Sequence, residues 1–356
     1  MSEAADIAAV PAGDRRARAR RATFGLAAAV CAVSVLSLAQ GPAGTSLWSA
    51  LAALVTGEPI PLRDRVVLLD IRLPRLALGL LVGAALAVSG AVMQGLFRNP
   101  LADPGLVGVS AGAGLGAIAA IVLGGALPVG AAALVGSSLV PLAAFFGGWI
   151  STLLLYRVST RGGRTSVATM LLAGIALGAL TGAVSGLLVY AADDAQLREL
   201  TFWGLGSLAG ASWPKLAVAG PIILTALALS PLLARGLNAL ALGEATAGYL
   251  GLPVQRIKSA AIVSVAAATG AAVAVSGGIG FIGIVVPHLL RLATGPDHRM
   301  LVPNAALLGA AMLILADVIA RGVIAPAELP IGIVTAIIGG PFFLWILLRS
   351  RGVLDL

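Results

Sequence analysis

The sequence predicts an all-α polytopic membrane protein with ten transmembrane helices, and three observations lead to this fold class. Hydrophobic residues make up 59% of the 356 residues and charged residues only 11%, against roughly 45–50% and 25% in a soluble domain. The mean hydropathy is +1.03. Apolar stretches of about 20 residues, long enough to cross a hydrocarbon core of about 30 Å, recur along the chain. A soluble enzyme of ordinary composition is therefore excluded.

Ten such stretches divide the chain, and each is predicted to be helical because backbone polar groups inside a bilayer have to be paired within their own segment. The seventh and eighth are parted only by the glycine-rich Ser276–Gly280. The predicted spans are residues 22–40, 74–97, 105–125, 136–156, 166–191, 214–234, 259–276, 279–293, 301–320 and 330–348. They form one permease domain over residues 22–356, preceded by a basic tail over residues 1–21.

Basic residues predict the orientation. If the N-terminus is inside and the spans alternate, 16 of the 23 Lys and Arg residues fall on the cytoplasmic side and 7 outside. This bias places both termini in the cytoplasm, and the net charge of +8 then reflects cytoplasmic loops rather than nucleic-acid binding. Arginines before the first span resemble a signal peptide, but the run Ala22–Ala39 is longer than an ordinary signal core. We expect an uncleaved span, with cleavage as the alternative.

Glycines recur every four residues in the fifth span, at Gly174, Gly178, Gly182 and Gly186. This spacing puts them on one face of a helix. A face without side chains lets another helix approach closely or leaves room for a bulky substrate. Tight helix packing and a transport pathway or dimer interface are both open interpretations of this face.

Short enzyme motifs are present but lack the expected context. The G-x-G-x-x-G at Gly278–Gly283 lies inside apolar sequence without a βαβ unit, so we do not interpret it as a dinucleotide site. The chain has no G-x-x-x-x-G-K-[ST] and cannot bind ATP through a P-loop by itself. A G-x-S-x-G surrounds Ser110, and His288 could serve as its base. An intramembrane serine protease is therefore a remote alternative.

Charged residues near the outer ends of spans require an explanation, because charge inside a membrane is costly. Asp317 precedes Arg321 by four residues, the favourable order for an ion pair on a helix. Arg72 and Arg75 flank the start of the second span. Mutual neutralisation and interfacial anchoring are the simple interpretations. Three arginines on the side where bases are scarce also suggest an anionic partner outside.

A polar loop follows the sixth span, from Leu242 to Ile257, and is broken near Gly251–Pro253. It is too polar to cross the membrane. It is either a solvated connector or a docking surface for a soluble subunit.

Three long segments resemble the FecCD-type permeases, the membrane subunits of type II ABC importers for iron–siderophores, heme and vitamin B12. They are RLPRLALGLLVGAALAVSGAVMQGLFRNPLADPGLVGVSAGAG (Arg72–Gly114), GIGFIGIVVPHLLRLATGPDHR (Gly278–Arg299) and ELPIGIVTAIIGGPFFLWILL (Glu328–Leu348). The resemblance covers nearly all of the chain after Leu68. It implies ten helices per subunit, a homodimer with the pathway at its interface, two ATPase subunits inside and a substrate-binding protein outside.

The resemblance also implies residue roles. The loop Gly243–Ile257 is similar to the coupling helices that enter a cleft of the ATPase, and Arg72, Arg75 and Arg321 match arginines that pair with glutamates of the binding protein. The glycine face of the fifth span and the tenth span match pathway-lining helices. The expected ATPase contacts are Gly243, Glu244, Ala245, Gly248, Leu250 and Gly251. Ser110 and His288 fall in family motifs that have no catalytic role.

The segment Asp193–Leu208 resembles the heme-importing branch of the family more than the siderophore branch. Arg198 suits a heme propionate, and Phe202 and Trp203 suit the face of a porphyrin. An ordinary interfacial helix with aromatic anchors is the simpler interpretation. Heme is therefore the expected substrate, with ferric siderophore or cobalamin as the alternatives.

The expected protein is a transport subunit of the cytoplasmic (inner) membrane and not an enzyme. We expect no catalytic or metal site and no cofactor in this chain; ATP and Mg²⁺ bind the partner ATPase. The expected partners are a second copy of the chain, two ABC ATPase subunits, a periplasmic heme-binding protein and membrane lipid. A channel or secondary transporter is a further alternative, but the chain lacks the series of buried carboxylates typical of a proton-coupled carrier.

Overall fold

The computed structural model describes residues 12–41, 47–128, 130, 136–162 and 164–349. Residues 1–11 of the predicted basic tail and residues 350–356 of the predicted permease domain lie outside this part. The helices are α1 (Ala12–Ala39), α2 (Leu47–Thr56), α3 (Leu62–Val66), α4 (Leu73–Phe97), α5 (Val109–Leu123), α7 (Leu139–Ser159), α8 (Val167–Tyr190), α9 (Asp194–Leu205), α10 (Trp213–Leu229), α11 (Ala234–Leu240), α12 (Glu244–Tyr249), α13 (Val254–Ser276), α14 (Ile282–Thr294), α15 (His298–Val323) and α16 (Ile331–Arg349).

Within the described residues the fold is all-helical apart from one small hairpin. A π-helix, Val67–Arg72, joins α3 to α4, and strands β1 (Thr160–Arg161) and β2 (Arg164–Thr165) pair antiparallel with Thr160 opposite Thr165. The all-α prediction missed this hairpin because two-residue strands leave no period in the sequence.

Eight helical segments in the described part of the chain are long and apolar enough to cross a membrane. They lie at eight of the ten predicted spans. The other two predicted spans, the eighth and the tenth, correspond to the shorter apolar helices α14 and α16. With only 13 residues, α14 is too short to cross a bilayer alone.

Helix α1 begins ten residues before the predicted first span. It runs without interruption from Ala12 to Ala39 and therefore includes the arginines that were assigned to a separate basic tail. Its partner is α15, and Thr23 Oγ1 donates to Asn304 Oδ1 over 2.7 Å. Residues 12–21 are thus helical and continuous with the predicted first span.

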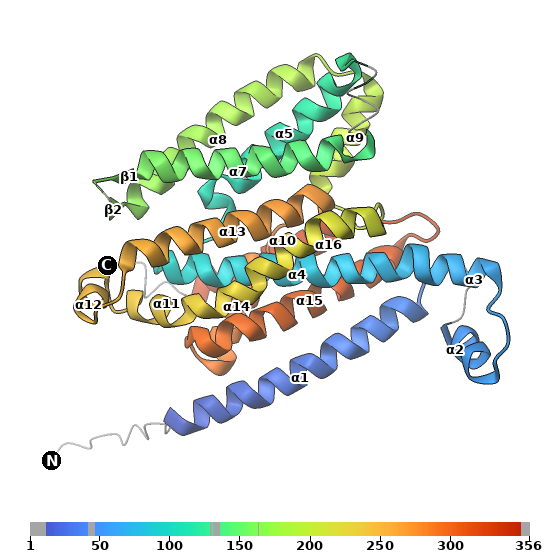
Figure 1. Ribbon diagram of the computed structural model, residues 1–356, viewed down its shortest axis with the longest axis horizontal. Helices are drawn as coiled ribbons and strands as arrows, with labels where there is room; N and C mark the ends of the chain where they lie inside the picture. Colours follow the sequence, from blue (N-terminus) through green and yellow to red (C-terminus); the bar gives the residue numbers. More distant parts are fainter. Residues whose placement is uncertain (1–11, 42–46, 129, 131–135, 163, 350–356) are drawn as a thin grey trace.

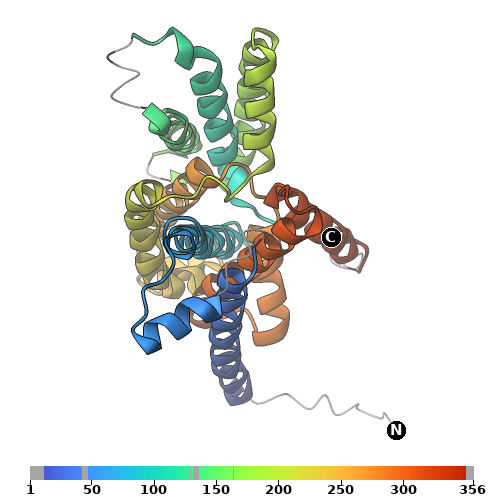
Figure 2. The same ribbon diagram turned by 90° about the vertical axis from the view of Figure 1, so that its right-hand side faces the viewer.

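Helix α4 occupies the centre of the larger helical group (Figure 2), with 20 of its 25 residues buried. It packs against α10, α13, α14 and α15. Glycines allow these close approaches, because a Cβ on Gly83 would overlap the carbonyl of Gly309 and a Cβ on Gly90 would overlap the carbonyl of Gly283. The apolar core of the molecule lies around this helix.

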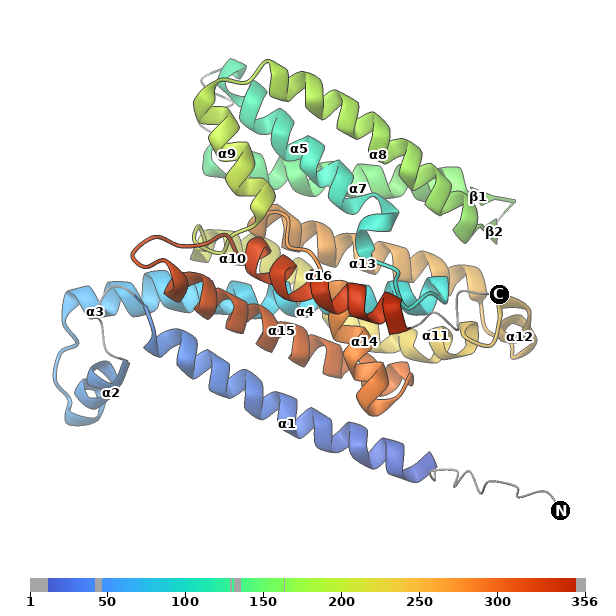
Figure 3. The same ribbon diagram turned by 180° about the vertical axis from the view of Figure 1, so that it is seen from behind.

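A second helical group, α5, α7, α8 and α9, lies to one side of the α4 group (Figures 1 and 3). Helices α5 and α7 contact one another through backbone, because Gly112 and Gly116 face Gly147 and Ala143. The hairpin and α12 lie at the end of the molecule where α1 begins, and α2, α3 and α9 lie at the opposite end (Figure 1). The predicted cytoplasmic and outer segments therefore separate to opposite ends.

Candidate functional site

A cavity of about 800 Å³ opens at the end of the molecule that holds α9. We call it the outer chamber; its walls come from α5, α7, α9, α10 and the end of α13. All three predicted substrate residues of α9, Arg198, Phe202 and Trp203, line it. The volume lies within the roughly 300–1,000 Å³ that is typical of small-molecule sites.

Local sequence fixes α9 beside the chamber. Asp193 accepts a hydrogen bond from Gln196 N while the Gln196 side chain accepts one from Asp193 N, which is a reciprocal capping box. Gln196 Nε2 also donates to Val122 O of α5 over 3.3 Å. Gly206, with φ 72°, ends the helix in a conformation that favours glycine. The helix is thus anchored at both ends.

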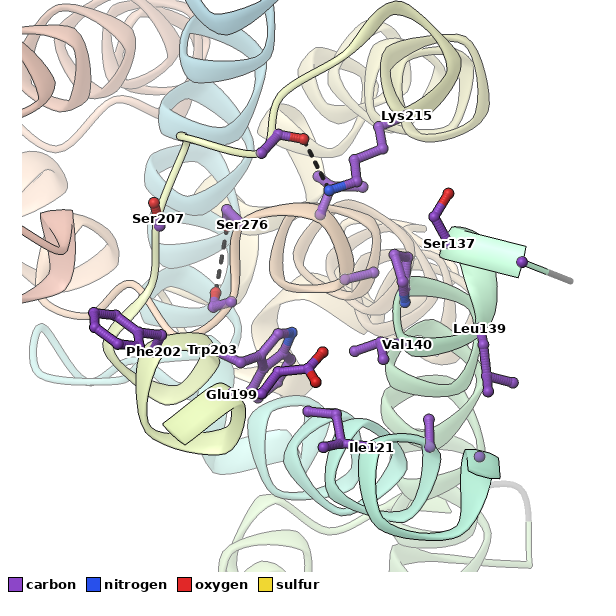
Figure 4. Close-up of a pocket in the computed structure, with 18 of the residues that line it drawn as sticks. Ile121, Ser137, Leu139, Val140, Glu199, Phe202, Trp203, Ser207, Lys215 and Ser276 are labelled. Atoms are coloured by element: carbon purple, nitrogen blue, oxygen red, sulfur yellow. Dashed lines mark hydrogen bonds between the residues drawn. The ribbon is translucent and has the colours of Figure 1, made fainter. Parts of the chain in front are cut away.

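The aromatic pair does not present one continuous face. Trp203 and Glu199 point together from α9 toward α5 and α7, whereas Phe202 lies on another side of the helix (Figure 4). Phe202 is 56% exposed. Both residues nevertheless line the same cavity, and packing of the two rings on a porphyrin stays a prediction.

Two charged residues of the chamber were not predicted. Glu199 lies beside Trp203, and Lys215 reaches in from the start of α10, where its Nζ donates to Gly210 O over 2.8 Å. Lys215 is one of only two lysines in the chain, and its place at the outer start of a span could have indicated it. The chamber thus combines two cationic side chains, one carboxylate and an indole.

A smaller cavity of about 200 Å³ lies deeper between α5 and α13. We call it the inner recess; Asp103, Ser110 and Thr269 supply its polar lining. Trp203 lines both cavities and packs against alanines of α5 between them. The backbone holds it there, because Trp203 O accepts from Gly278 N over 3.3 Å. Trp203 therefore separates the outer chamber from the inner recess.

The predicted serine–histidine pair is not assembled. Among the described residues, Ser110 and His288 share no hydrogen bond: Ser110 lines the inner recess, and the His288 ring lies edge-on to Phe342 with centroids 6.2 Å apart. A nucleophile has to reach its base within hydrogen-bonding distance. The geometry does not support proteolysis.

The glycine face of α8 is open. Cβ atoms built on Gly178, Gly182 and Gly186 would meet nothing within 4 Å among the residues that the structure describes. Only Met170 and Thr181 of this helix are buried. The fourth predicted residue, Gly174, shares the face by its spacing. Packing inside the protomer, one of the two predicted interpretations, therefore does not explain this face.

The three outer arginines are buried. Arg72, Arg75 and Arg321 are only 5–7% exposed. Arg75 binds Asp317 (Nη2 to Oδ1, 2.8 Å) and Glu328 (Nη1 to Oε2, 2.9 Å). The predicted i,i+4 pair between Arg321 Nε and Asp317 Oδ2 is present at 3.0 Å.

The same arginines also hold α1. Arg321 Nη1 donates to Gln40 O over 2.9 Å, and Arg72 Nη1 donates to Leu38 O. Their burial follows from these internal partners. Their role in docking a binding protein stays a prediction.

The predicted coupling loop forms an exposed short helix, α12. Gly243 (φ 107°) and Gly251 (φ 77°) mark its two ends in a backbone region that favours glycine. Tyr249 is 92% and Leu250 62% exposed, and Ala245 and Gly248 are also exposed. Glu244 forms an ion pair with Lys258 of α13. An exposed apolar surface beside polar loops is typical of a protein interface.

Residues 29–349 match the FecCD transport family. The chain belongs to this family. As a FecCD protein it is the permease subunit of an ABC importer, a multi-pass protein of the cytoplasmic membrane and not itself an enzyme. This membership removes the protease alternative that the G-x-S-x-G motif had left open.

Named relatives of this FecCD permease differ in what they carry. The hemin transport system permease HmuU of Yersinia pestis is 50% identical over 290 residues, which are 80% of this chain and 83% of that protein. The cobalamin import permease BtuC of Halobacterium salinarum is 44% identical over 83% of this chain and 76% of that protein. A solved inward-facing metal-chelate type ABC transporter matches with a TM-score of 0.81 and 31% identity over 93% of this chain and 99% of that chain.

Proposed function

We propose that this FecCD permease moves heme across the cytoplasmic membrane by ATP-driven alternating access. The observation that carries the proposal is the outer chamber, where Arg198 and Lys215 offer cationic groups beside the Trp203 indole. Heme is a planar apolar ligand with two carboxylates, which suit charge-assisted hydrogen bonds and aromatic packing. The 50% identity to a hemin permease supports the same substrate.

Cobalamin is the second candidate, because BtuC of Klebsiella pneumoniae is 43% identical over 94% of this chain and 96% of that protein. Ferric siderophores are the third. The chamber favours heme among the three, since a ligand with two anionic arms uses both cations of the chamber.

We further propose the type II importer assembly, with ten transmembrane helices per subunit, in which the short α14 is completed by its neighbours, and with both termini cytoplasmic. Two copies would meet at the glycine face of α8, with α16 also lining the pathway. Two ABC ATPases would bind α12 and carry ATP and Mg²⁺, and a periplasmic heme-binding protein would dock at the outer end. A role in docking stays a prediction for Arg72, Arg75 and Arg321. Because these side chains are buried, they would contribute by holding the helices of the outer end in place.

Stimulation of the ATPase tests the substrate. The purified complex would be mixed with binding protein loaded with heme, ferric siderophore or cobalamin, and ATP hydrolysis and uptake into vesicles would be measured. We expect heme to stimulate most. Stimulation by cobalamin alone would transfer the assignment to the second candidate.

Substitutions in the chamber sharpen this test. Arg198→Gln with Lys215→Gln should lower heme uptake roughly a hundredfold, the effect of losing two hydrogen bonds to charged groups at about tenfold or more each. Glu199→Gln is the matched control, because it removes a charge from the same wall without removing a cation, and it should leave uptake intact. Equal loss in all variants would mean that the chamber only supports the fold.

A further inference from the structure

Lys258 is a buried cation with partners on two separate segments. It is only 2% exposed in the first turns of α13. Its Nζ forms an ion pair with Glu244 of α12 and also donates to Thr165 O of β2 over 2.9 Å. A buried ammonium group is stable only while it is paired and hydrogen-bonded. The two contacts are therefore expected to persist together.

A second residue of α13 strengthens the link to the hairpin. Gln255 Oε1 accepts hydrogen bonds from Thr165 N and from Thr165 Oγ1, each over 3.1 Å. The backbone N–H and C=O of Thr165 are thus both held by α13. These bonds fix Thr165 to the start of α13. A hairpin of two-residue strands would hold its residues less firmly by itself.

Thr165 is also the last residue before the cap of α8. Ser166 follows it and accepts a hydrogen bond from Thr169 N over 3.2 Å as the N-cap of that helix. Whatever displaces Thr165 therefore displaces the start of α8. This helix carries the open glycine face and has 22 of its 24 residues outside the core, because only Met170 and Thr181 are buried.

Helix α12 has only six residues. A helix of this length is not stable alone in water, so its place depends on tertiary contacts. The Glu244–Lys258 pair and the buried Ala247 are two such contacts, and α12 packs against both α11 and α13. The charged pair therefore gives movement of α12 a direct connection to the start of α13.

We propose that Lys258 is a positioning residue that links α12 to the start of α8, so that displacement of α12 by the ATPase moves the helix with the open glycine face. This inference rests on the proposed coupling role of α12. It adds a defined route from that contact to the pathway, through Glu244, Lys258 and Thr165.

The test measures movement directly. Spin labels would be placed at Tyr249 of α12 and at Thr169 of α8, both exposed, after replacement of the single Cys31, in the complete complex with its ATPase in nanodiscs. The distance between each label and the label at the same site of the second copy would be measured with and without ATP. In the otherwise unchanged complex both distances should change when ATP binds.

Lys258→Met keeps an unbranched apolar side chain, one atom shorter, and removes the charge and the donors. We expect α12 to move as before, the change at Thr169 to be lost, and the substrate transported per ATP to fall with it. Arg235→Met is the matched control, since Arg235 is an exposed cation on neighbouring α11, outside the loop Gly243–Ile257. It should leave both movements unchanged.

Glu244→Gln provides a second variant in case Lys258→Met does not fold, because the Glu244 side chain is 45% exposed. It should also reduce the change at Thr169. An unaltered change at Thr169 in both variants would overturn the role of Lys258. Absence of ATP-dependent movement at Tyr249 in the unsubstituted complex would instead contradict the coupling role of α12 itself.

Discussion

Helices α4 and α8 are both glycine-rich and apolar, yet the structure uses them in opposite ways. In α4, 20 of 25 residues are buried, and in α8 only 2 of 24. A Cβ on Gly79 of α4 would lie 2.6 Å from Ile314 Cδ1, whereas none of the described residues lies within 4 Å of a Cβ on Gly182 of α8. One helix uses its glycines for packing inside the protomer, and the other leaves them uncovered.

Helix α5 shows that glycine spacing does not decide between these roles. Gly108, Gly112 and Gly116 repeat every four residues, like the glycines of α8, but Gly112 and Gly116 pack against the backbone of α7. The spacing gives only a face without side chains. Whether that face is covered depends on which helix lies against it.

The largest effect is expected from Gly90→Ala in α4. The new Cβ would overlap the carbonyl of Gly283, and backbone on both sides cannot yield as a flexible side chain would. We expect a loss of about 3 kcal/mol or more in the free energy of unfolding, seen as aggregation during purification or a marked fall in Tm. A stable, monodisperse Gly90→Ala protein would contradict the close contact between α4 and α14.

A comparable effect is expected at the ion pairs that anchor α4. Helix α8 has no such charged anchor. Asp317→Asn would leave Arg75 and Arg321 without their shared carboxylate. Breaking a buried ion pair by removing one partner costs about 3–5 kcal/mol. Thermal unfolding in detergent measures this. Glu328→Gln is the milder control because that side chain is 30% exposed; equal effects of the two changes would contradict the central place of Asp317.

In α8 the same kind of substitution should spare the fold. Gly182→Ala meets open space and should leave Tm unchanged or raise it slightly, because alanine favours a helix by up to about 1 kcal/mol. Gly182→Leu should also fold, but should abolish dimer formation and uptake if this face is the dimer interface or pathway. Cross-linking and vesicle uptake measure this. A dimeric, active Gly182→Leu protein would mean that the face meets only lipid.

The smallest effect concerns the cap of α15, the helix that packs beside α4. Burial alone would raise the pKa of Asp297, but hydrogen bonds from Arg299 N and Asn238 Nδ2 prevail and lower it. A lowered pKa in the folded state stabilises the protein above the unfolded value of about 3.9, and this stability is lost as pH falls through the folded pKa.

Two substitutions test the cap of α15. Asp297→Ala should cost about 1 kcal/mol at neutral pH, as loss of a helix cap does. Asp297→Asn should keep the cap and remove its acid dependence. The measurement is Tm between about pH 3 and 6, a range that includes the unfolded pKa of about 3.9. An unchanged acid dependence in Asp297→Asn would assign that dependence to another carboxylate.

The sequence alone determined the membrane class, because a bilayer demands long apolar helices whose backbone groups are paired internally. It also determined the family, through long motifs from Arg72 to Gly114 and from Gly278 to Arg299. Arg198, Phe202 and Trp203 were predicted together because one amphipathic segment holds all three. The sequence likewise shows that neither lysine stands in a P-loop motif.

Only the tertiary structure decided which glycine faces are covered, where the outer arginines point and what completes the chamber. Arg75 and Asp317 are 242 positions apart, and Lys258 and Thr165 are 93 apart. No local pattern encodes such pairs, because they depend on how helices distant in the chain pack together. The burial of Arg72, Arg75 and Arg321, the entry of Lys215 into the chamber and the open face of α8 all follow from that packing.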